Sequence, residues 1–172
     1  MAKMRKAVAY RRLERPYTRK SKYKSLSYVR STPTSKVVRY DMGTAGKKFQ
    51  NKFSLLSKSD LQIRHNAIES ARVASVRVLE QSLGKTGFHL MIRMYPHHIL
   101  RENPLAAGAG ADRMSTGMQR SFGKCIGLAA QIRKGKTLFT IEVDAVNAQI
   151  ARDALKAAGH KFACRTQIVQ DY

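Results

Sequence analysis

The residues of this chain that could bind a metal or move a proton are few and poorly spaced for either task. Of the five histidines, only His97 and His98 are adjacent, and neighbouring residues of a strand point to opposite faces. No HxxxH, HExxH or cysteine cluster is present, so the sequence predicts no metal site and no cofactor. Acid–base catalysis needs paired carboxylates or a histidine with an orienting partner, and the only candidate for such a pair is Asp112 with His97. We therefore expect no catalytic residues.

Two further patterns that could carry chemistry are weak. The stretch GAGADR at 108–113 is faintly similar to a dinucleotide-binding loop, but Arg113 replaces the third glycine and no Gly-Lys-Ser/Thr ending follows. Cys125 and Cys164 stand 39 residues apart and form no CxxC pair. We expect reduced, mostly buried thiols in a cytosolic protein and no nucleotide-binding loop.

The net charge of the chain indicates which class of partner it binds. The 172 residues contain 33 Lys and Arg against 11 Asp and Glu, a net charge of +22. Such an excess opposes compaction unless a polyanion neutralises it, and nucleic acid is the usual polyanion. A membrane surface is the alternative, but it calls for a basic amphipathic helix or a long apolar run, and the sequence shows neither. We therefore expect a nucleic-acid partner and no membrane.

The cations are concentrated at the N-terminus. Residues 1–30 hold eleven Lys or Arg and one acid, whereas residues 137–172 hold four of each and are neutral. Tyrosines alternate with these cations, and Pro16 and Pro33 discourage a continuous helix. We expect residues 1–35 to form an extended basic arm that is ordered only by a partner, with phosphates neutralised by cations and bases stacked on tyrosines. A disordered solubilising tail is the alternative.

The remaining residues, 36–172, have the periodicity of one globular domain. Alternating hydrophobicity predicts strands at 37–40, 53–56, 88–94, 126–132, 139–143 and 162–168. Helical spacing predicts a helix that follows an Asn66 cap and ends at Gly84, and a second between Asp144 and Gly159. This order predicts an α+β fold, a two-layer sandwich with two helices on one face of a mostly antiparallel or mixed sheet.

A long connection, 101–124, separates two of these strands and is rich in glycine and cations. Connections of this length in a small domain are usually functional or disordered. Within it, residues 112–122 have the spacing of a short helix. We expect the tip of this connection to be a flexible cationic finger, and residues 102–117 to be a functional loop.

Candidate RNA-binding residues are the cations, tyrosines and histidines of the arm, of the strand edges and of the turn at 133–135. They are Tyr10, Arg11, Arg12, Arg15, Tyr17, Arg19, Lys20, Lys22, Tyr23, Lys24, Arg30, Arg93, His97, His98, Arg101, Lys124, Arg133 and Lys134. The candidates in the functional loop are Asn103, Gly108, Gly110, Asp112, Arg113, Gly117 and Arg120.

Three parts of the chain, the second of them in two pieces, resemble one known family. They are AGADRMSTGMQRSFGK (109–124), AYRRLERPYTRKSKY (9–23) followed by SKVVRYDMG (35–43), and GFHLMIRMYPHHILREN (87–103). They are similar to the universal large-subunit ribosomal proteins called L-sixteen in bacteria and L-ten-e in archaea, and the arm and loop look like the archaeal branch. Two positions depart from the archaeal and eukaryotic pattern, with Cys125 in place of a frequent proline and Ala9 in place of a frequent cysteine.

The resemblance implies a sandwich with an α/β-hammerhead element that binds large-subunit rRNA near the peptidyl-transferase centre and the A-site cleft. It also implies that the loop points toward the acceptor region of tRNA. The implied partners are rRNA, tRNA, neighbouring ribosomal proteins and late assembly factors, in the cytoplasm and without a homo-oligomer. Any structural magnesium would belong to the rRNA.

Two alternatives to the ribosomal function remain. An RNA-modifying or RNA-processing enzyme could use the central loop as a lid, with Asp112 and His97 as its acid–base pair. A general nucleic-acid coat protein would carry uniform charge, and the neutral C-terminal residues argue against it.

Overall fold

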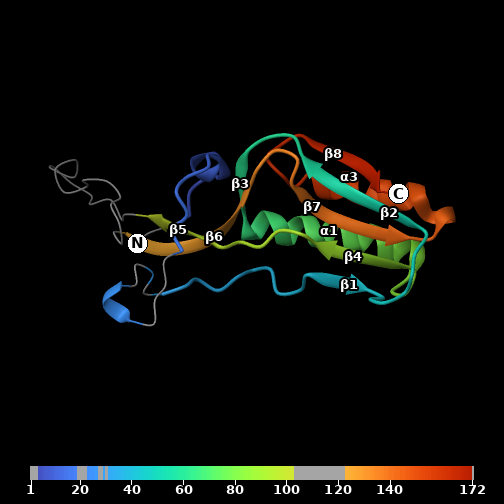
Figure 1. The fold of residues 1–172 in the computed structure, drawn as a ribbon, viewed down its shortest axis with the longest axis horizontal. Helices are drawn as coiled ribbons and strands as arrows, with labels where there is room; N and C mark the ends of the chain where they lie inside the picture. Colours follow the sequence, from blue (N-terminus) through green and yellow to red (C-terminus); the bar gives the residue numbers. More distant parts are fainter. Residues whose placement is uncertain (1–3, 19–22, 27–28, 30, 103–122, 172) are drawn as a thin grey trace.

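The structure is a computed structural model that describes residues 4–18, 23–26, 29, 31–102 and 123–171. In these residues the strands are β1 (Asp41–Gly43), β2 (Asn51–Ser57), β3 (Leu61–Arg64), β4 (Phe88–Ile92), β5 (His98–Glu102), β6 (Lys124–Ile132), β7 (Thr137–Val143) and β8 (Thr166–Asp171). The α-helices are α1 (His65–Leu83) and α3 (Ala148–Gly159), and short 3-10 turns are η1 (Ala7–Tyr10), η2 (Lys24–Leu26) and η3 (Ala145–Asn147) (Figure 1).

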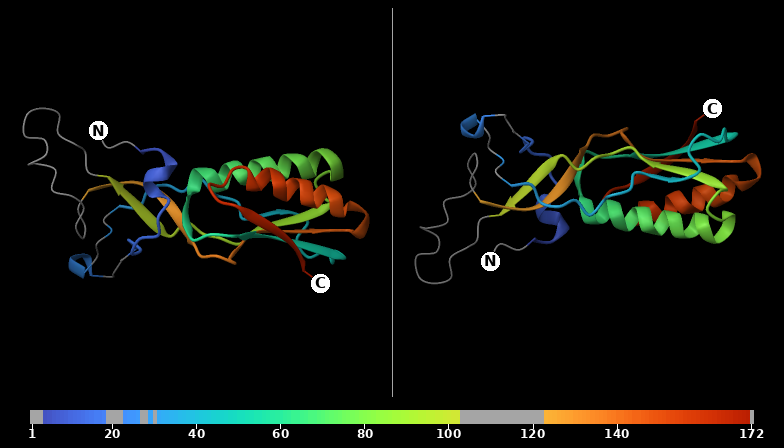
Figure 2. Two further views of the ribbon diagram at one scale, coloured as in Figure 1. Left: turned by 90° about the horizontal axis from the view of Figure 1, so that it is seen from above. Right: turned by 90° about the horizontal axis from the view of Figure 1, so that it is seen from below.

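The strands of the described residues form two antiparallel sheets. The larger has five strands in the order β1-β4-β7-β2-β8, and the smaller has three in the order β3-β6-β5. Helices α1 and α3 lie side by side on one face of the larger sheet, whereas the smaller sheet and the N-terminal segment occupy the other end of the molecule (Figures 1 and 2). The fold is therefore α+β, with a helical layer on an antiparallel sheet.

The core lies between the helices and the five-stranded sheet. Alternate residues of the central strands are buried there, among them Phe53, Leu90 and Ile141. Burying a side chain of this size stabilises the fold by about 1.5–3 kcal/mol. The two helices also share a polar contact, because the Ser75 hydroxyl shares its single proton between the carbonyls of Ala71 (3.0 Å) and Ala154 (3.2 Å).

The helices agree with the sequence prediction in extent and differ in their N-terminal caps. Gly84 ends α1 as predicted, with φ of +67° and its N–H donated to the Glu80 carbonyl. Helix α1 begins at His65, so Asn66 lies inside its first turn and the side chain does not cap it. Asp144 precedes the turn η3, and its carboxylate pairs with the Lys47 ammonium at 3.0 Å.

The strands differ from the prediction in three places. Residues 37–40, expected as a strand, form a connection that leads into β1. Val37 is buried and Val38 is 80% exposed, and the pairing of β1 with β4 starts only at Asp41. Strands β3 and β5 were not predicted, because each is short and ends in charged residues. Phe162 packs in the core as expected, but β8 begins four residues later, at Thr166.

The N-terminal residues 4–17 differ from the expected free arm. Tyr10 packs with Leu100 and Ala129 of the smaller sheet, and Tyr17 packs with Ile99 and its neighbours. The protein itself therefore orders this part of the arm. The short helix predicted at 112–122 lies outside the described residues.

Candidate RNA-binding surface

Two glutamines, the buried Gln62 and the half-buried Gln131, fix the main chain of the N-terminal arm on the smaller sheet. The Gln62 side-chain amide on β3 donates hydrogen bonds to the carbonyls of Tyr10 (3.2 Å) and Arg12 (2.5 Å). The Gln131 amide on β6 donates to the Glu14 carbonyl (2.8 Å) and to Gln62 Oε1 (3.1 Å). Side-chain amides that satisfy backbone carbonyls in this way give an irregular segment hydrogen-bond partners that it would otherwise find in a strand.

Histidines add two further hydrogen bonds to the N-terminal segment. His98 Nδ1 accepts the backbone N–H of Tyr17 at 2.8 Å, and His65 Nδ1 accepts that of Lys36 at 3.2 Å. Burial lowers the pKa of both imidazoles, and nearby cations lower it further, Arg101 beside His98 and Lys36 beside His65. His98, a predicted RNA-binding residue, is buried and has a positioning contact with the arm instead.

Two of the tyrosines predicted to stack on RNA are buried in the protein. Tyr10 and Tyr17 are each 7% exposed. The Tyr10 hydroxyl donates a hydrogen bond to Glu102 (3.1 Å), and burial, followed by this carboxylate, raises its pKa. The Arg101 guanidinium lies 3.7 Å above the centroid of the Tyr17 ring, a cation–π contact. In this structure the two rings anchor the arm, and their faces are not presented to a partner.

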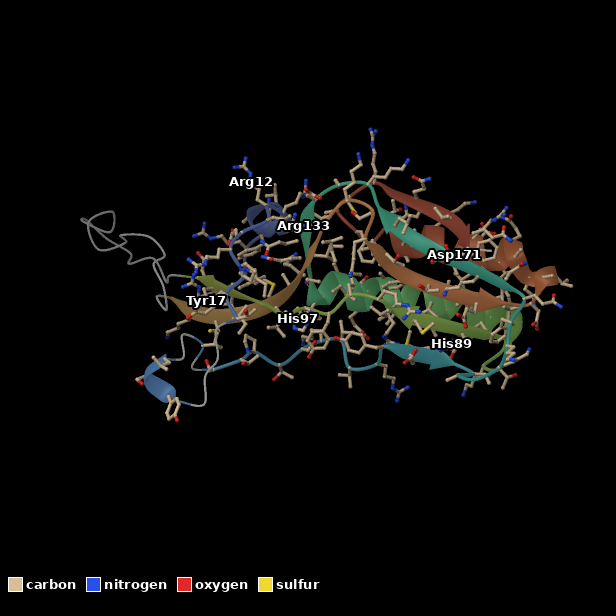
Figure 3. All side chains as sticks on the ribbon, in the orientation of Figure 1. Arg12, Tyr17, His89, His97, Arg133 and Asp171 are labelled. Carbon is tan, nitrogen blue, oxygen red and sulfur yellow. The ribbon has the colours of Figure 1, made fainter. Side chains whose placement is uncertain are left out.

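The cations of the arm have the opposite orientation. Arg11, Arg12 and Arg15 are exposed, although the carbonyls of Arg11 and Arg12 are bonded to β3. Arg133 and Lys134, also exposed, lie in the turn after β6, whose end pairs with β3. Figure 3 shows Arg12 and Arg133 projecting from these neighbouring segments. The structure thus brings together five of the predicted cations on one surface, here called the arm–turn surface.

A second cationic surface lies on the face of the larger sheet that the helices leave open. A pocket of about 360 Å³ there is lined by Lys52, Ser54, Arg93, Lys136, Thr137, Thr140 and Asp171. The Ser54 hydroxyl donates to Asp171 at 2.5 Å and Arg93 Nε donates to the Thr140 hydroxyl at 3.4 Å. Arg93 was predicted, whereas Lys52 and Lys136 were missed. Lys52 is half-buried on β2, one residue before the predicted strand 53–56.

The root of the central loop is tied to the arm. Glu102 and Lys124 pair across the ends of β5 and β6, where the loop begins and ends. Arg5 forms an ion pair with Glu102 at 2.6 Å, beside the hydrogen bond from Tyr10. A contact that the sequence did not predict therefore links the arm to the strand end that leads into the loop.

Some of the remaining candidate residues are exposed, and the others lie outside the described residues. Tyr23 is described and exposed, as are His97 and Lys124. Outside the described residues lie Arg19, Lys20, Lys22, Arg30, the side chain of Lys24, and the loop residues Asn103, Gly108, Gly110, Asp112, Arg113, Gly117 and Arg120.

The part of the chain that the structure describes offers no group of three or more His, Cys, Asp or Glu arranged to hold a metal ion. Among the same residues, neither α-helix has the length and apolar character needed to cross a bilayer.

Comparisons with known proteins identify the family of this chain. A family described as "Ribosomal protein L16p/L10e" matches residues 13–169. The chain is 46% identical over 167 residues to the "Large ribosomal subunit protein uL16" of Methanococcus maripaludis strain C7, covering 96% of this chain and 93% of that protein. It is 40% identical over 163 residues to the protein of the same name from Archaeoglobus fulgidus, covering 95% and 90%. The chain therefore belongs to the ribosomal protein L16p/L10e family.

Proposed function

We propose that this chain is a structural constituent of the large ribosomal subunit that binds its rRNA near the peptidyl-transferase centre and the A-site cleft. The central loop is proposed to help position tRNA there. Membership of the L16p/L10e family makes the chain a ribosomal protein and not an enzyme. The names of its archaeal relatives support the assignment to the large subunit.

The observation that supports RNA binding most directly is the arm–turn surface. The backbone carrying Arg11, Arg12 and Arg15 is held by Gln62 and Gln131, so its cations are already ordered beside Arg133 and Lys134. Groups that are ordered before binding lose less conformational entropy in the complex. The surface can therefore bind phosphates more tightly than the same cations on a disordered tail.

Recognition by this surface is expected to rest on the shape and the sugar–phosphate backbone of the RNA. Folded RNA hides its base edges in a deep, narrow major groove. Each phosphate neutralised by a lysine or arginine steepens the log–log dependence of binding on salt by about 0.7–0.9. The net charge of +22 provides for many such contacts.

Sedimentation of tagged protein through a high-salt gradient tests the proposal. We expect the protein to migrate with large subunits and to cross-link to large-subunit rRNA. Recovery only in the soluble fraction, or with the small subunit, would overturn it. Cross-links to rRNA outside the peptidyl-transferase region would retain the ribosomal function and overturn the proposed location.

The enzyme alternative gains no support from the described residues. The His97 ring contacts Tyr95 in a tilted arrangement with centroids 4.6 Å apart, and its candidate partner Asp112 lies outside the described residues. Family membership corrects this alternative in favour of a structural component. Contacts with tRNA and with late assembly factors remain part of the proposal.

A further inference from the structure

Three aromatic rings lie in contact beside the connection between β4 and β5, one pair stacked and the other tilted. The centroids of Tyr40 and Tyr95 are 5.4 Å apart with an interplanar angle of 23°, and those of Tyr95 and His97 are 4.6 Å apart at 44°. Tyr95 is nevertheless 52% exposed, between the buried residues Met94 and Pro96. Packing therefore fixes the orientation of the ring while half of its surface remains accessible.

Two of these rings, Tyr95 and His97, border a pocket between the N-terminal segment and the smaller sheet. Its volume is about 510 Å³, and it is lined by Thr18, Thr32, Tyr95, Pro96, His97, Ile99 and Leu128. Ile99 and Leu128 form an apolar wall, because both belong to the small core under Tyr17. Thr18, Thr32 and His97 place hydroxyl and imidazole groups around the pocket. Figure 3 shows His97 on the connection that leads into β5.

We propose that this pocket receives one unstacked base of RNA, which stacks on the Tyr95–His97 pair. The inference rests on the proposed function and adds a specific ligand, a single nucleobase, and a specific site. RNA-binding proteins commonly capture splayed-out bases on aromatic side chains and complete the contact with polar groups at the base edge. The pocket combines a pre-oriented ring, an apolar wall and side chains that can both donate and accept hydrogen bonds.

Charge favours a nucleobase over an aromatic side chain of a neighbouring protein. The two threonines are joined by a stretch, 19–31, that contains five Lys or Arg and no acid in its sequence. A chain segment that approaches this part of the surface therefore gains most if it carries phosphates. An apolar protein side chain would also leave the hydroxyls of Thr18 and Thr32 and the His97 ring without new polar partners.

The test is ultraviolet cross-linking of large subunits that contain this chain, followed by trypsin digestion and mass spectrometry. Cleavage after Arg93 and Arg101 releases the peptide 94–101, which contains both Tyr95 and His97. We expect this peptide to carry a nucleotide adduct in wild-type subunits. The adduct should persist in Tyr95→Phe, which keeps the ring, and fall about tenfold in Tyr95→Leu, in line with the stacking contribution of one base.

A second measurement tests the same contact by RNA binding, so that a loss caused by misfolding of the leucine variant can be recognised. In this measurement the protein binds a single-stranded RNA that contains 2-aminopurine, and the fluorescence of 2-aminopurine is quenched when that base stacks on an aromatic ring. We expect Tyr95→Leu to weaken this binding about tenfold relative to Tyr95→Phe. His97→Gln removes the second ring and should produce a smaller loss in the same direction. The thermal unfolding midpoint of each variant identifies any loss that comes from the fold.

The outcomes separate this inference from the proposed function. If the chain migrates with large subunits and other peptides carry adducts but 94–101 does not, the pocket proposal is overturned and the ribosomal function stands. Equal behaviour of Tyr95→Leu and Tyr95→Phe, or a protein–protein cross-link at 94–101, also overturns it. If the chain never migrates with large subunits, both proposals fail.

Discussion

His98 and Tyr17 are joined by a hydrogen bond of 2.8 Å from the backbone N–H of Tyr17 to Nδ1 of the imidazole. An imidazole that accepts at Nδ1 must carry its proton at Nε2 and be neutral. His65 has the same arrangement with the N–H of Lys36. The N-terminal segment is therefore attached to the domain at two points that require uncharged histidines.

The stability of this attachment should decrease in mild acid. Burial first, then Arg101, lowers the pKa of His98 below 6.5, and burial with Lys36 and Arg64 does the same for His65. The unfolded chain therefore takes up protons as the pH falls through about 6.5, while the folded chain resists them. The free energy of unfolding should be at its full value above that pH and fall below it. Urea unfolding of the free protein at pH 7.5 and pH 5.5 measures the difference.

Two charged side chains lie near His98, and a variant that does not titrate provides the control for the pH experiment. Arg101 opposes protonation, whereas Glu14 Oε2, 4.0 Å from Nε2, is an exposed acid that favours it only weakly. His98→Asn can place an amide oxygen near the position of Nδ1 and does not titrate. We expect a smaller loss of stability between the two pH values in this variant. An unchanged pH dependence would show that His98 does not cause it.

Gln62→Leu should loosen the arm while leaving most of the domain folded. The substitution removes the donors to the Tyr10 and Arg12 carbonyls and the acceptor for the Gln131 amide. Leaving such groups unpaired costs roughly 1–3 kcal/mol each when they are buried. We expect a lower unfolding midpoint and faster tryptic cleavage after Arg11 and Arg12. The matched control is Gln149→Leu on the exposed side of α3, where the amide donates a hydrogen bond to Asp153 one turn away; this variant should change neither.

The sequence predicted the periodic elements well, because hydrophobic alternation and helical spacing report directly on burial. Strands β4 and β7 and both helices follow from such patterns. The division into two sheets does not, since a strand's own pattern does not identify its neighbour. Docking of the arm depends on single polar contacts from Gln62 and His98 to distant backbone groups, and these contacts have no periodic signature.

Gly43 and Gly46 offer a matched test of close packing at the edge of the larger sheet. Both have φ of +88°, so alanine at either position is strained by roughly 1–2 kcal/mol. A Cβ at Gly43 would also lie 2.1 Å from the Phe88 carbonyl oxygen, whereas a Cβ at Gly46 would meet nothing within 4 Å. We expect Gly43→Ala to lower the thermal unfolding midpoint clearly more than Gly46→Ala. Equal midpoints would mean that β1 does not pair with β4 as described.

The arm–turn surface should determine incorporation into the subunit. Replacing Arg11, Arg12 and Arg15 together by glutamine removes three exposed cations and leaves the backbone contacts of Gln62 intact. If each binds a phosphate, the log–log salt slope of rRNA binding should fall by about 2–3. Occupancy of large subunits, measured by quantitative mass spectrometry at two salt concentrations, should fall more at the higher one. Replacement of three cations on the helical side, Arg77, Arg152 and Lys156, by glutamine is the control and should have little effect.

The cations of the central loop should act at a later step than those of the arm. Arg113 and Arg120 lie outside the described residues, in the connection between the ends of β5 and β6, and none of the contacts described for the domain and the arm involves them. Their replacement by glutamine therefore leaves the contacts that hold the domain and the arm in place. We expect normal occupancy of large subunits, with weaker A-site tRNA binding and slower peptide elongation in a purified translation system. If the loop variant instead fails to enter subunits while the triple arm variant enters normally, the two surfaces have the opposite division of labour.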